Sequence, residues 1–214
     1  MEQTDIWSIN PSTSATFFKT AATVTGGVYP QALVFTNTNP VVAKEGAGYK
    51  VIITSGGDDR TANFTINGAI VGQLTEQGQV PNPNNPEVLA GGNAGAVTSA
   101  YFYSRIDSIT ISKAAAGTVA VGTTGDLALP RCRIKGFYVL GDAGAGSLKI
   151  NRFSYTTSAY PTVAVESLLD ITTPAGATLT QFLSLPGQGI LTGQQHNDFA
   201  VVTLDGADYS LFCG

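Results

Sequence analysis

The stretch Gly48-Tyr-Lys-Val-Ile-Ile-Thr54 decides the fold, together with the Ser55-Gly-Gly-Asp-Asp59 and Ala62-Asn-Phe-Thr-Ile-Asn67 segments that follow it. The first segment is rich in β-branched residues, and the last alternates apolar Phe64 and Ile66 with polar neighbours. Such runs are typical of β-strands, whereas Gly-Asp clusters are typical of turns. The three segments predict a β-hairpin with a loop of about seven residues.

The same pattern continues along the rest of the chain. Further short strands with turn residues between them are predicted at Ala69–Glu76, Val97–Tyr103, Ser108–Ser112, Thr118–Gly122, Leu129–Leu140, Ser147–Ser154, Thr162–Ile171, Thr178–Leu185, Phe199–Leu204 and Tyr209–Cys213. The last two are expected to pair as a hairpin around Asp205-Gly206, and Thr162–Ile171 also fits a helical turn. No window keeps a period of 3.6 residues, so no long helix is expected.

These segments predict an all-β protein of two antiparallel β-sandwich domains, immunoglobulin-like or jelly-roll-like, preceded by an N-terminal arm. The arm takes residues 1–20, the first domain residues 21–126 and the second domain residues 127–214. The boundary is expected in the turn Gly122-Thr-Thr-Gly125. A long Pro- and Asn-rich loop, residues 77–95, is expected to project from the first domain.

The composition narrows the classes of partner. Only 12% of the residues are charged, against a usual share of about 25%, which fits a surface covered by partners or one of uncharged polar side chains. The net charge is −4 and no basic run occurs, so no nucleic acid is expected as a partner. No window approaches the length of about 18 apolar residues that a membrane helix requires. The acidic N-terminus has no apolar signal core, so synthesis in a cytoplasm is expected.

Three groups of residues are candidates for contact with other subunits. The N-terminal arm either reaches a neighbouring subunit or folds back on its own domain. The long loop either contacts a neighbour or is a tolerated surface insertion. A short row of positive side chains either pairs with an acidic neighbour or is solvated. The candidate interface residues are Trp7, Phe17 and Phe18 in the arm, Pro81, Asn82, Pro83, Asn84, Asn85 and Pro86 in the loop, and Arg131, Arg133 and Lys135 in the row. Within that row the side chains of Cys132 and Ile134 are expected to point inward.

No combination of residues predicts catalysis, a cofactor or a metal. The single histidine, His196, has Asp198 nearby, but no Gly-x-Ser-x-Gly elbow supplies a serine. The carboxylates lie mostly in turns, where Asp bonds to its own backbone. Asp58-Asp59 lacks the further oxygen ligands of a calcium loop. The chain is therefore expected not to be an enzyme.

The two cysteines, Cys132 and Cys213, approach each other if the first and last strands of the second domain pair. Two buried free thiols are the expectation over a disulfide, because intracellular cysteines are usually reduced.

The first part of the chain has a distinct order of strands and Gly-rich turns, in the segments Tyr49–Asp59, Asn63–Gly68, Gly91–Ser99 and Ser108–Gly122. A second set follows in Leu129–Gly136, Thr173–Gly176 and Leu185–Ile190. This pattern, over roughly residues 45–214, resembles structural proteins of tailed bacteriophages from marine and freshwater bacteria, including cyanophages. The resemblance implies a virion component assembled in the host cytoplasm. The long loop at residues 77–95 departs from the pattern.

Three functions remain open. The first is a capsid decoration or cement protein, a homo-oligomer that contacts the major capsid protein and stabilises the head. The second is a neck or tail component, such as an adaptor, nozzle or fibre-attachment protein. The third is a module for host glycans, for which the aromatic candidates are Tyr101, Phe102, Tyr103, Phe153, Tyr155 and Tyr160, although strand aromatics more often belong to a core.

Overall fold

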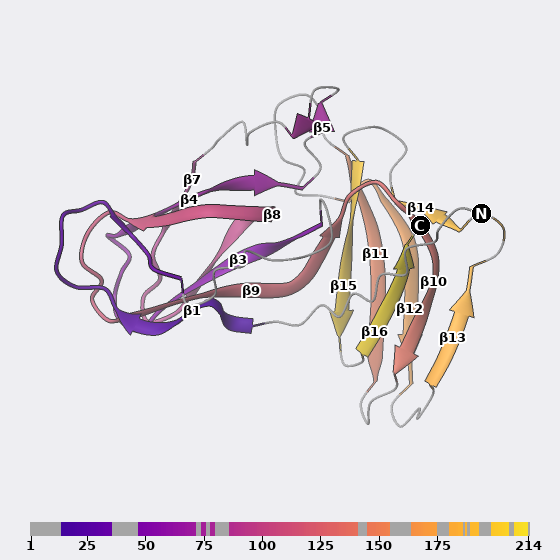
Figure 1. Ribbon diagram of the computed structural model, residues 1–214. Helices are drawn as coiled ribbons and strands as arrows, with labels where there is room; N and C mark the ends of the chain where they lie inside the picture. Colours follow the sequence, from indigo (N-terminus) through magenta and orange to yellow (C-terminus); the bar gives the residue numbers. More distant parts are fainter. Residues whose placement is uncertain are drawn as a thin grey trace. The chain divides into compact units, whose positions relative to one another are not determined.

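The computed structural model confirms the all-β, antiparallel class (Figure 1). It describes residues 14–35, 47–71, 74–75, 78–79, 86–140, 145–154, 164–174, 180–185, 187, 189–192, 198–205 and 208–213. Within these ranges the regular elements are all strands, and no helix occurs. The described residues fall into two compact units, one within Ser12–Gly125 and the other within Asp126–Gly214. That each unit is an independent domain stays a prediction.

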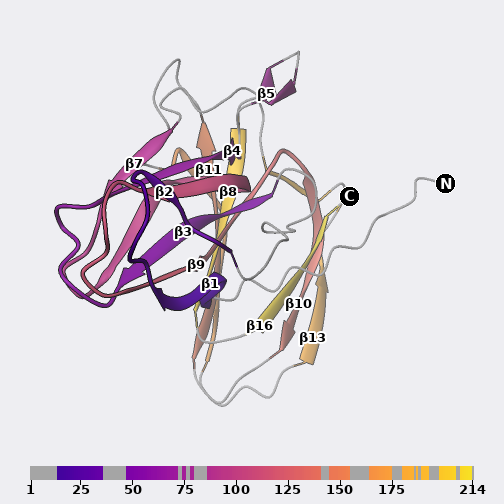
Figure 2. The same cartoon turned by 60° about the vertical axis from the view of Figure 1, so that its left-hand side comes forward.

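The first unit is built around one long, central strand. Its strands are β1 (Ser14–Thr23), β2 (Gln31–Ala32), β3 (Gly48–Ser55), β4 (Asn63–Ile70), β5 (Leu74–Thr75), β6 (Gly78–Gln79), β7 (Glu87–Ala90), β8 (Ala96–Ile111) and the first part of β9 (Thr118–Leu129). The order across the sheet is β9-β3-β8-β4-β7 (Figure 2). In addition, β1 pairs with β9 and β2 pairs with β8. β5 and β6 pair only with each other.

The predicted hairpin of the opening stretch is wrong, although both of its strands form. β3 and β4 do not pair, because β8 lies between them. β8 pairs with β3 through Ala96–Tyr103 and with β4 through Tyr103–Ile111. The two separate strands expected in this region are therefore one continuous strand, long enough to pair with a different neighbour along each half.

Three further expectations about this unit need correction. β1 begins at Ser14, inside the predicted arm, because this segment pairs with β9. β7 occupies part of the predicted loop, residues 77–95, because its residues pair with Asn63–Ile66 of β4. β9 continues through Gly122–Gly125, where a turn is expected, and its end at Leu127–Leu129 pairs in the second unit.

The core of the first unit follows the predicted alternation. Phe64 and Ile66 of β4 have no exposed side-chain surface, and they lie opposite Ile111 and Ile109 of β8. Neighbours that face each other across two strands are the main stabilising pairs of a sheet. Each fully buried side chain of this size contributes roughly 1.5–3 kcal/mol. The four residues thus fix the register of β4 on β8.

The second unit consists of two sheets. Its strands are β10 (Arg133–Leu140), β11 (Gly146–Ser154), β12 (Glu166–Thr173), β13 (Thr180–Ser184), β14 (Ile190–Leu191), β15 (Asp198–Asp205) and β16 (Asp208–Cys213). One sheet has the order β12-β11-β15 and is extended by the end of β9; in the other, β10 pairs with β13, β14 and β16. The segment that also fitted a helical turn is strand β12.

The predicted C-terminal hairpin is wrong for a related reason. β15 pairs with β11 and β9, whereas β16 pairs with β10, so the chain changes sheets between them. Consecutive strands commonly change sheets in sandwiches. The pairing of β10 with β16 does bring the first and last strands together, with Ile134 opposite Cys213. Cys132 is half-buried, and the expectation of two free thiols stays a prediction.

Candidate interaction surface

Three turns at one end of the first unit hold one another through backbone hydrogen bonds. We call residues 56–62, 91–95 and 112–118 the interlocked turns; the last of them includes Thr118, the first residue of β9. The amide of Gly56 donates to the Thr118 carbonyl at 2.7 Å, that of Ala94 to Gly57 at 2.8 Å, and that of Asp59 to Gly92 at 2.9 Å. Each turn therefore satisfies backbone groups of another, and the end of the unit is built as one piece.

Glycine is required where these turns touch. A Cβ on Gly57 would lie 2.8 Å from the Ala116 carbonyl carbon, and one on Gly117 would lie 2.7 Å from Gly57 N. A Cβ on Gly91 would lie 2.4 Å from the Asp59 oxygen. The glycine-rich segments seen in the sequence thus reflect close backbone contact.

Asp59 is the buried side chain at the centre of the interlocked turns. Only 2% of the residue is exposed, and its Oδ1 accepts a hydrogen bond from Ala116 N at 2.7 Å. Its own carbonyl accepts from Ala62 N at 2.8 Å. These contacts give Asp59 a structural role in the turns.

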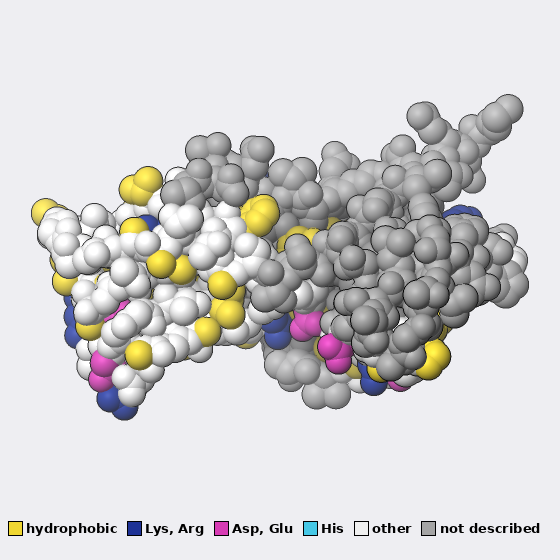
Figure 3. Space-filling model, turned by 90° about the horizontal axis from the view of Figure 1, so that it is seen from below, with side chains coloured by type: hydrophobic (Ala, Val, Ile, Leu, Met, Phe, Trp, Pro, Cys, Tyr) yellow, Lys and Arg dark blue, Asp and Glu magenta, His cyan; other side chains and the backbone are white. Residues whose placement is uncertain are grey.

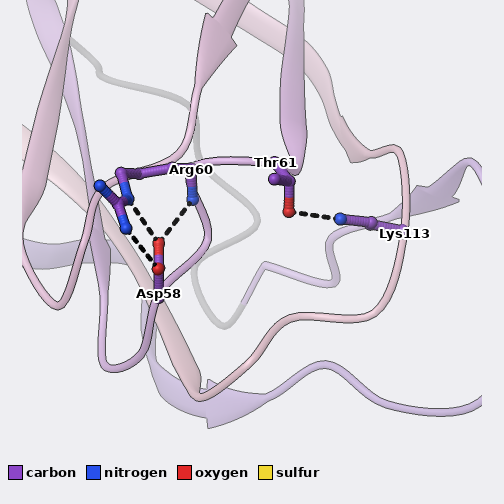
Figure 4. Close-up of polar contacts among 4 residues, drawn as sticks. All are labelled: Asp58, Arg60, Thr61 and Lys113. Atoms are coloured by element: carbon purple, nitrogen blue, oxygen red, sulfur yellow. Dashed lines mark hydrogen bonds and ion pairs between the residues drawn. The ribbon is translucent and has the colours of Figure 1, made fainter.

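The exposed side chains at the same end are paired with each other (Figure 4). Arg60 contacts Asp58 through two parallel hydrogen bonds, Nε to Oδ1 at 2.9 Å and Nη2 to Oδ2 at 2.8 Å. These bonds lower the pKa of Asp58 to about 2, so it is ionised at neutral pH. Lys113 Nζ donates to Thr61 Oγ1. Exposed pairs of this kind contribute little to the free energy of unfolding.

Large apolar side chains are exposed on the first unit. Val28 is 91% exposed, Val34 79%, Val88 55% and Phe17 37%. Figure 3 shows one face of the molecule, on which the described surface is mostly uncharged, with separate hydrophobic side chains and few charged ones. Scattered apolar residues are normal on a protein surface. Here they lie on a surface of a chain in which only 12% of the residues are charged.

The structure separates the candidate residues of the arm. Phe18 is 1% exposed, so its side chain packs within its own unit and has almost no surface for a neighbour. Phe17, at the exposed side of β1, packs edge-to-face on Phe18 with ring centroids 5.1 Å apart. Trp7 lies outside the described residues. Of the arm candidates in the described part, Phe17 is the one that a partner can reach.

The loop and row candidates are placed in part. Pro86 is exposed immediately before β7, and residues 81–85 lie outside the described ranges. Arg131 and Lys135 are exposed and Arg133 is half-buried, whereas Ile134 is fully buried. The row thus has the predicted outward face, and its pairing with an acidic neighbour stays a prediction.

Three of the aromatic candidates for glycan binding belong to the core. Tyr101, Phe102 and Tyr103 are 8%, 5% and 0% exposed. Phe153 stacks on Phe199, with ring centroids 5.5 Å apart and an interplanar angle of 14°. Tyr155 and Tyr160 lie outside the described residues. The first three side chains have no face on which a sugar ring can stack.

The buried carboxylate of Glu87 could not be predicted, because the Pro and Asn residues before it favour a loop. Glu87 is 7% exposed and accepts hydrogen bonds from Ala100 N at 2.6 Å and from the Tyr103 hydroxyl at 2.7 Å. Burial raises the pKa of Glu87, and the two hydrogen bonds offset only part of that rise. The contacts fasten the edge strand β7 to β8.

A second group of charges, which no sequence pattern indicates, lies in the second unit. The side chain of Arg152 is 15% exposed; its Nη2 lies 2.8 Å from Glu166 Oε2 and its Nη1 lies 3.8 Å from Asp198 Oδ2. The Asp198 side chain is only 2% exposed. Asp198 therefore lies beside Arg152. His196, which is close to Asp198 in the sequence, lies outside the described residues. The group links β11, β12 and β15.

Among the described residues, no group of three or more His, Cys, Asp or Glu side chains is placed to hold a metal ion. The described part also contains no helix long and apolar enough to cross a membrane. Comparison with protein-family models, curated proteins and solved structures found no match.

Proposed function

We propose that this chain is a non-enzymatic structural subunit of a tailed-phage virion, and that it acts as a homo-oligomeric decoration protein that stabilises the capsid through subunit contacts. Placement in the neck or tail, as an adaptor, nozzle or fibre-attachment protein, is the second candidate and shares the same physical basis. The phage assignment itself rests on the resemblance of the strand-and-turn pattern described above.

The exposed apolar side chains of the first unit are the observation that supports an assembly role. Val28, Val34 and Val88 are each more than half exposed. Burial of apolar surface is the main favourable term in protein association, at roughly 25 cal/mol per Å². Few charges need to lose their water when such a surface is covered, because only 12% of the residues are charged.

The strand arrangement supports the same reading. β7 is the last strand in its sheet order, so within the described residues its outer edge has no partner strand. A free edge can accept a strand from another chain. The buried aromatics disfavour glycan binding through Tyr101–Tyr103, and we do not propose that function.

The copy number of the chain in purified particles tests the proposal and separates its two forms. Quantitative mass spectrometry against the major capsid protein should give hundreds of copies for a decoration protein. A few copies to a few tens would contradict decoration and favour the neck or tail. Absence from particles would contradict a virion role altogether.

A substitution of one exposed apolar side chain tests the homo-oligomer. Val28→Asp should weaken self-association in sedimentation velocity by placing a charge in the interface, with the melting temperature unchanged because Val28 is 91% exposed. Val165→Asp is the matched control, since Val165 is also exposed but belongs to the second unit. A wild-type protein that stays monomeric at all concentrations would contradict the oligomer.

A further inference from the structure

A small hollow of about 190 Å³ lies in the first unit, between β1 and the segment that leads into and out of β2. Its lining includes Lys19, Thr23, Thr25, Gln31, Leu33 and Val34. One water needs only about 15 Å³ of such space, so the hollow is large enough for a small organic ion. Its wall combines a cation, hydroxyl and amide groups, and apolar side chains.

Lys19 is the unusual member of this wall. The residue is only 8% exposed, and it lies in β1 opposite Val121 of β9. Among the residues that the structure describes, no carboxylate forms an ion pair with it. Lysine is almost never this buried without a partner, because removing its charge from water is costly. The hollow therefore holds a positive charge that favours a negative group beside it.

Gln31 supplies a second polar group. Its Oε1 is buried and accepts no hydrogen bond within the described part of the chain. The two ends of an amide exchange by a rotation of the side chain, which then presents the NH₂ donors instead. A Cβ on Gly27 would lie 3.2 Å from this oxygen, and Gly27 has a φ of +145°, a conformation that favours glycine. The Gly27 backbone thus lies close to the Gln31 amide.

We propose that this hollow binds a small carboxylate. The carboxylate pairs with the Lys19 ammonium and accepts hydrogen bonds from the Gln31 amide and the Thr23 or Thr25 hydroxyl, while Leu33 and Val34 contact its carbon atoms. A free organic acid and an acidic side chain of another protein chain present the same group. This inference is independent of the proposed virion role.

Acetate is the probe for the site. Sodium acetate should raise the melting temperature of the wild-type protein above that in sodium chloride of equal ionic strength, since a ligand that binds only the folded state stabilises it. Lys19→Gln should abolish this difference. Lys113→Gln is the matched control because Lys113 is an exposed lysine of the same unit, and it should keep the full response.

A local measurement covers the case in which Lys19→Gln alters folding. In the wild-type protein, acetate should shift the side-chain NH₂ resonances of Gln31 with a saturable dependence, while chloride leaves them in place. Resonances that do not move, or an acetate response that Lys19→Gln and Lys113→Gln share equally, would overturn the proposal. In that outcome Lys19 only packs its stem and extends its charge to water.

The source of the carboxylate is distinguished by self-association. If it belongs to a second copy of the chain, acetate should compete with it, and Lys19→Gln should lower the association constant at least tenfold in sedimentation. If it is a free acid, the wild type and Lys19→Gln should sediment alike, and only the wild type should respond to acetate. Both results support the site, whereas a tighter association of Lys19→Gln in acetate-free buffer would contradict it.

Discussion

At the scale of single residues, two adjacent carboxylates of one turn have different roles. Asp58 is exposed and paired with Arg60, whereas Asp59 is buried and bonded to the backbone of another turn. The sequence identifies both as turn residues but does not tell them apart. The difference depends on Ala116, which is distant in the chain and reaches Asp59 only after the three turns have assembled.

Asp59→Ala should destabilise the first unit by about 1–3 kcal/mol, because it removes the buried side chain that accepts the hydrogen bond of the Ala116 amide. Urea unfolding followed by circular dichroism measures the change. Asp58→Ala is the control, and its midpoint should match that of the wild type because the pair it removes is exposed. Equal losses in the two variants would show that Asp59 has no special role.

Glu87 should make the stability depend on pH. Its pKa in the folded state is raised above the ordinary value of 4.5, so the folded protein holds its proton over a range in which the unfolded chain has lost it. Stability is therefore full below the ordinary pKa and decreases as pH rises through the folded pKa.

Glu87→Gln should remove this decrease, since Gln accepts from Ala100 N and donates to the Tyr103 hydroxyl without ionising. Unfolding midpoints at pH 4, 5, 6 and 7 should shift in favour of the variant as pH rises. A constant difference between the two proteins over this range would contradict the raised pKa.

At the scale of elements, strands were easier to predict than their partners. The period of two around Phe64 and Ile66 depends only on local sequence, and it correctly identified β4 and its buried face. The insertion of β8 between β3 and β4, and the separation of β15 from β16, depend on pairing between distant segments. The short β7 was missed because Pro and Asn around it dominate the local pattern.

Gly122 belongs to the expected boundary turn but lies instead within β9, where β1 pairs with it. A Cβ here would lie 1.8 Å from the carbonyl oxygen of Ser14. Gly122→Ala should therefore displace the start of β1 and destabilise the protein by about 1–3 kcal/mol, as overpacking typically does. Hydrogen exchange of the β1 amides locates the effect.

Gly95→Ala is the control for this prediction, because the nearest atom to its new Cβ is Asn93 O at 3.6 Å, an ordinary contact. The two variants should differ clearly in melting temperature. Equal melting temperatures for Gly122→Ala and Gly95→Ala would contradict the close approach of β1 to Gly122.

At the scale of the whole molecule, the two units have their own buried side chains. Phe64 and Ile109 are fully buried in the first, and Phe137 and Leu148 are at most 2% exposed in the second. Alternation predicted the buried faces of Phe64 and Ile109 but places Phe137 on the outward face of Arg133 and Lys135. An irregularity in the register of β10 on β16, between Ile134 and Gly136, changes the side to which Phe137 points. The hollow beside Lys19 could not be predicted, because a lysine in a strand normally faces water.

Calorimetry of the full chain tests whether the units are domains. Phe64→Ala and Phe137→Ala each create a cavity and should cost about 3–5 kcal/mol. Two independent domains should give two transitions, with Phe64→Ala lowering one and Phe137→Ala the other. A single transition that both substitutions lower would show that the two units unfold as one cooperative domain.

The interlocked turns also constrain how this chain can evolve. Each of the three turns supplies backbone hydrogen bonds to another, and Gly57, Gly91 and Gly117 permit the close approach. An inserted or deleted residue in any one turn shifts the carbonyls on which the other two depend. Changes of length at this end are therefore expected to accumulate in all three turns together, while the side chains of Asp58, Arg60 and Lys113, which extend from the same scaffold, can vary one at a time.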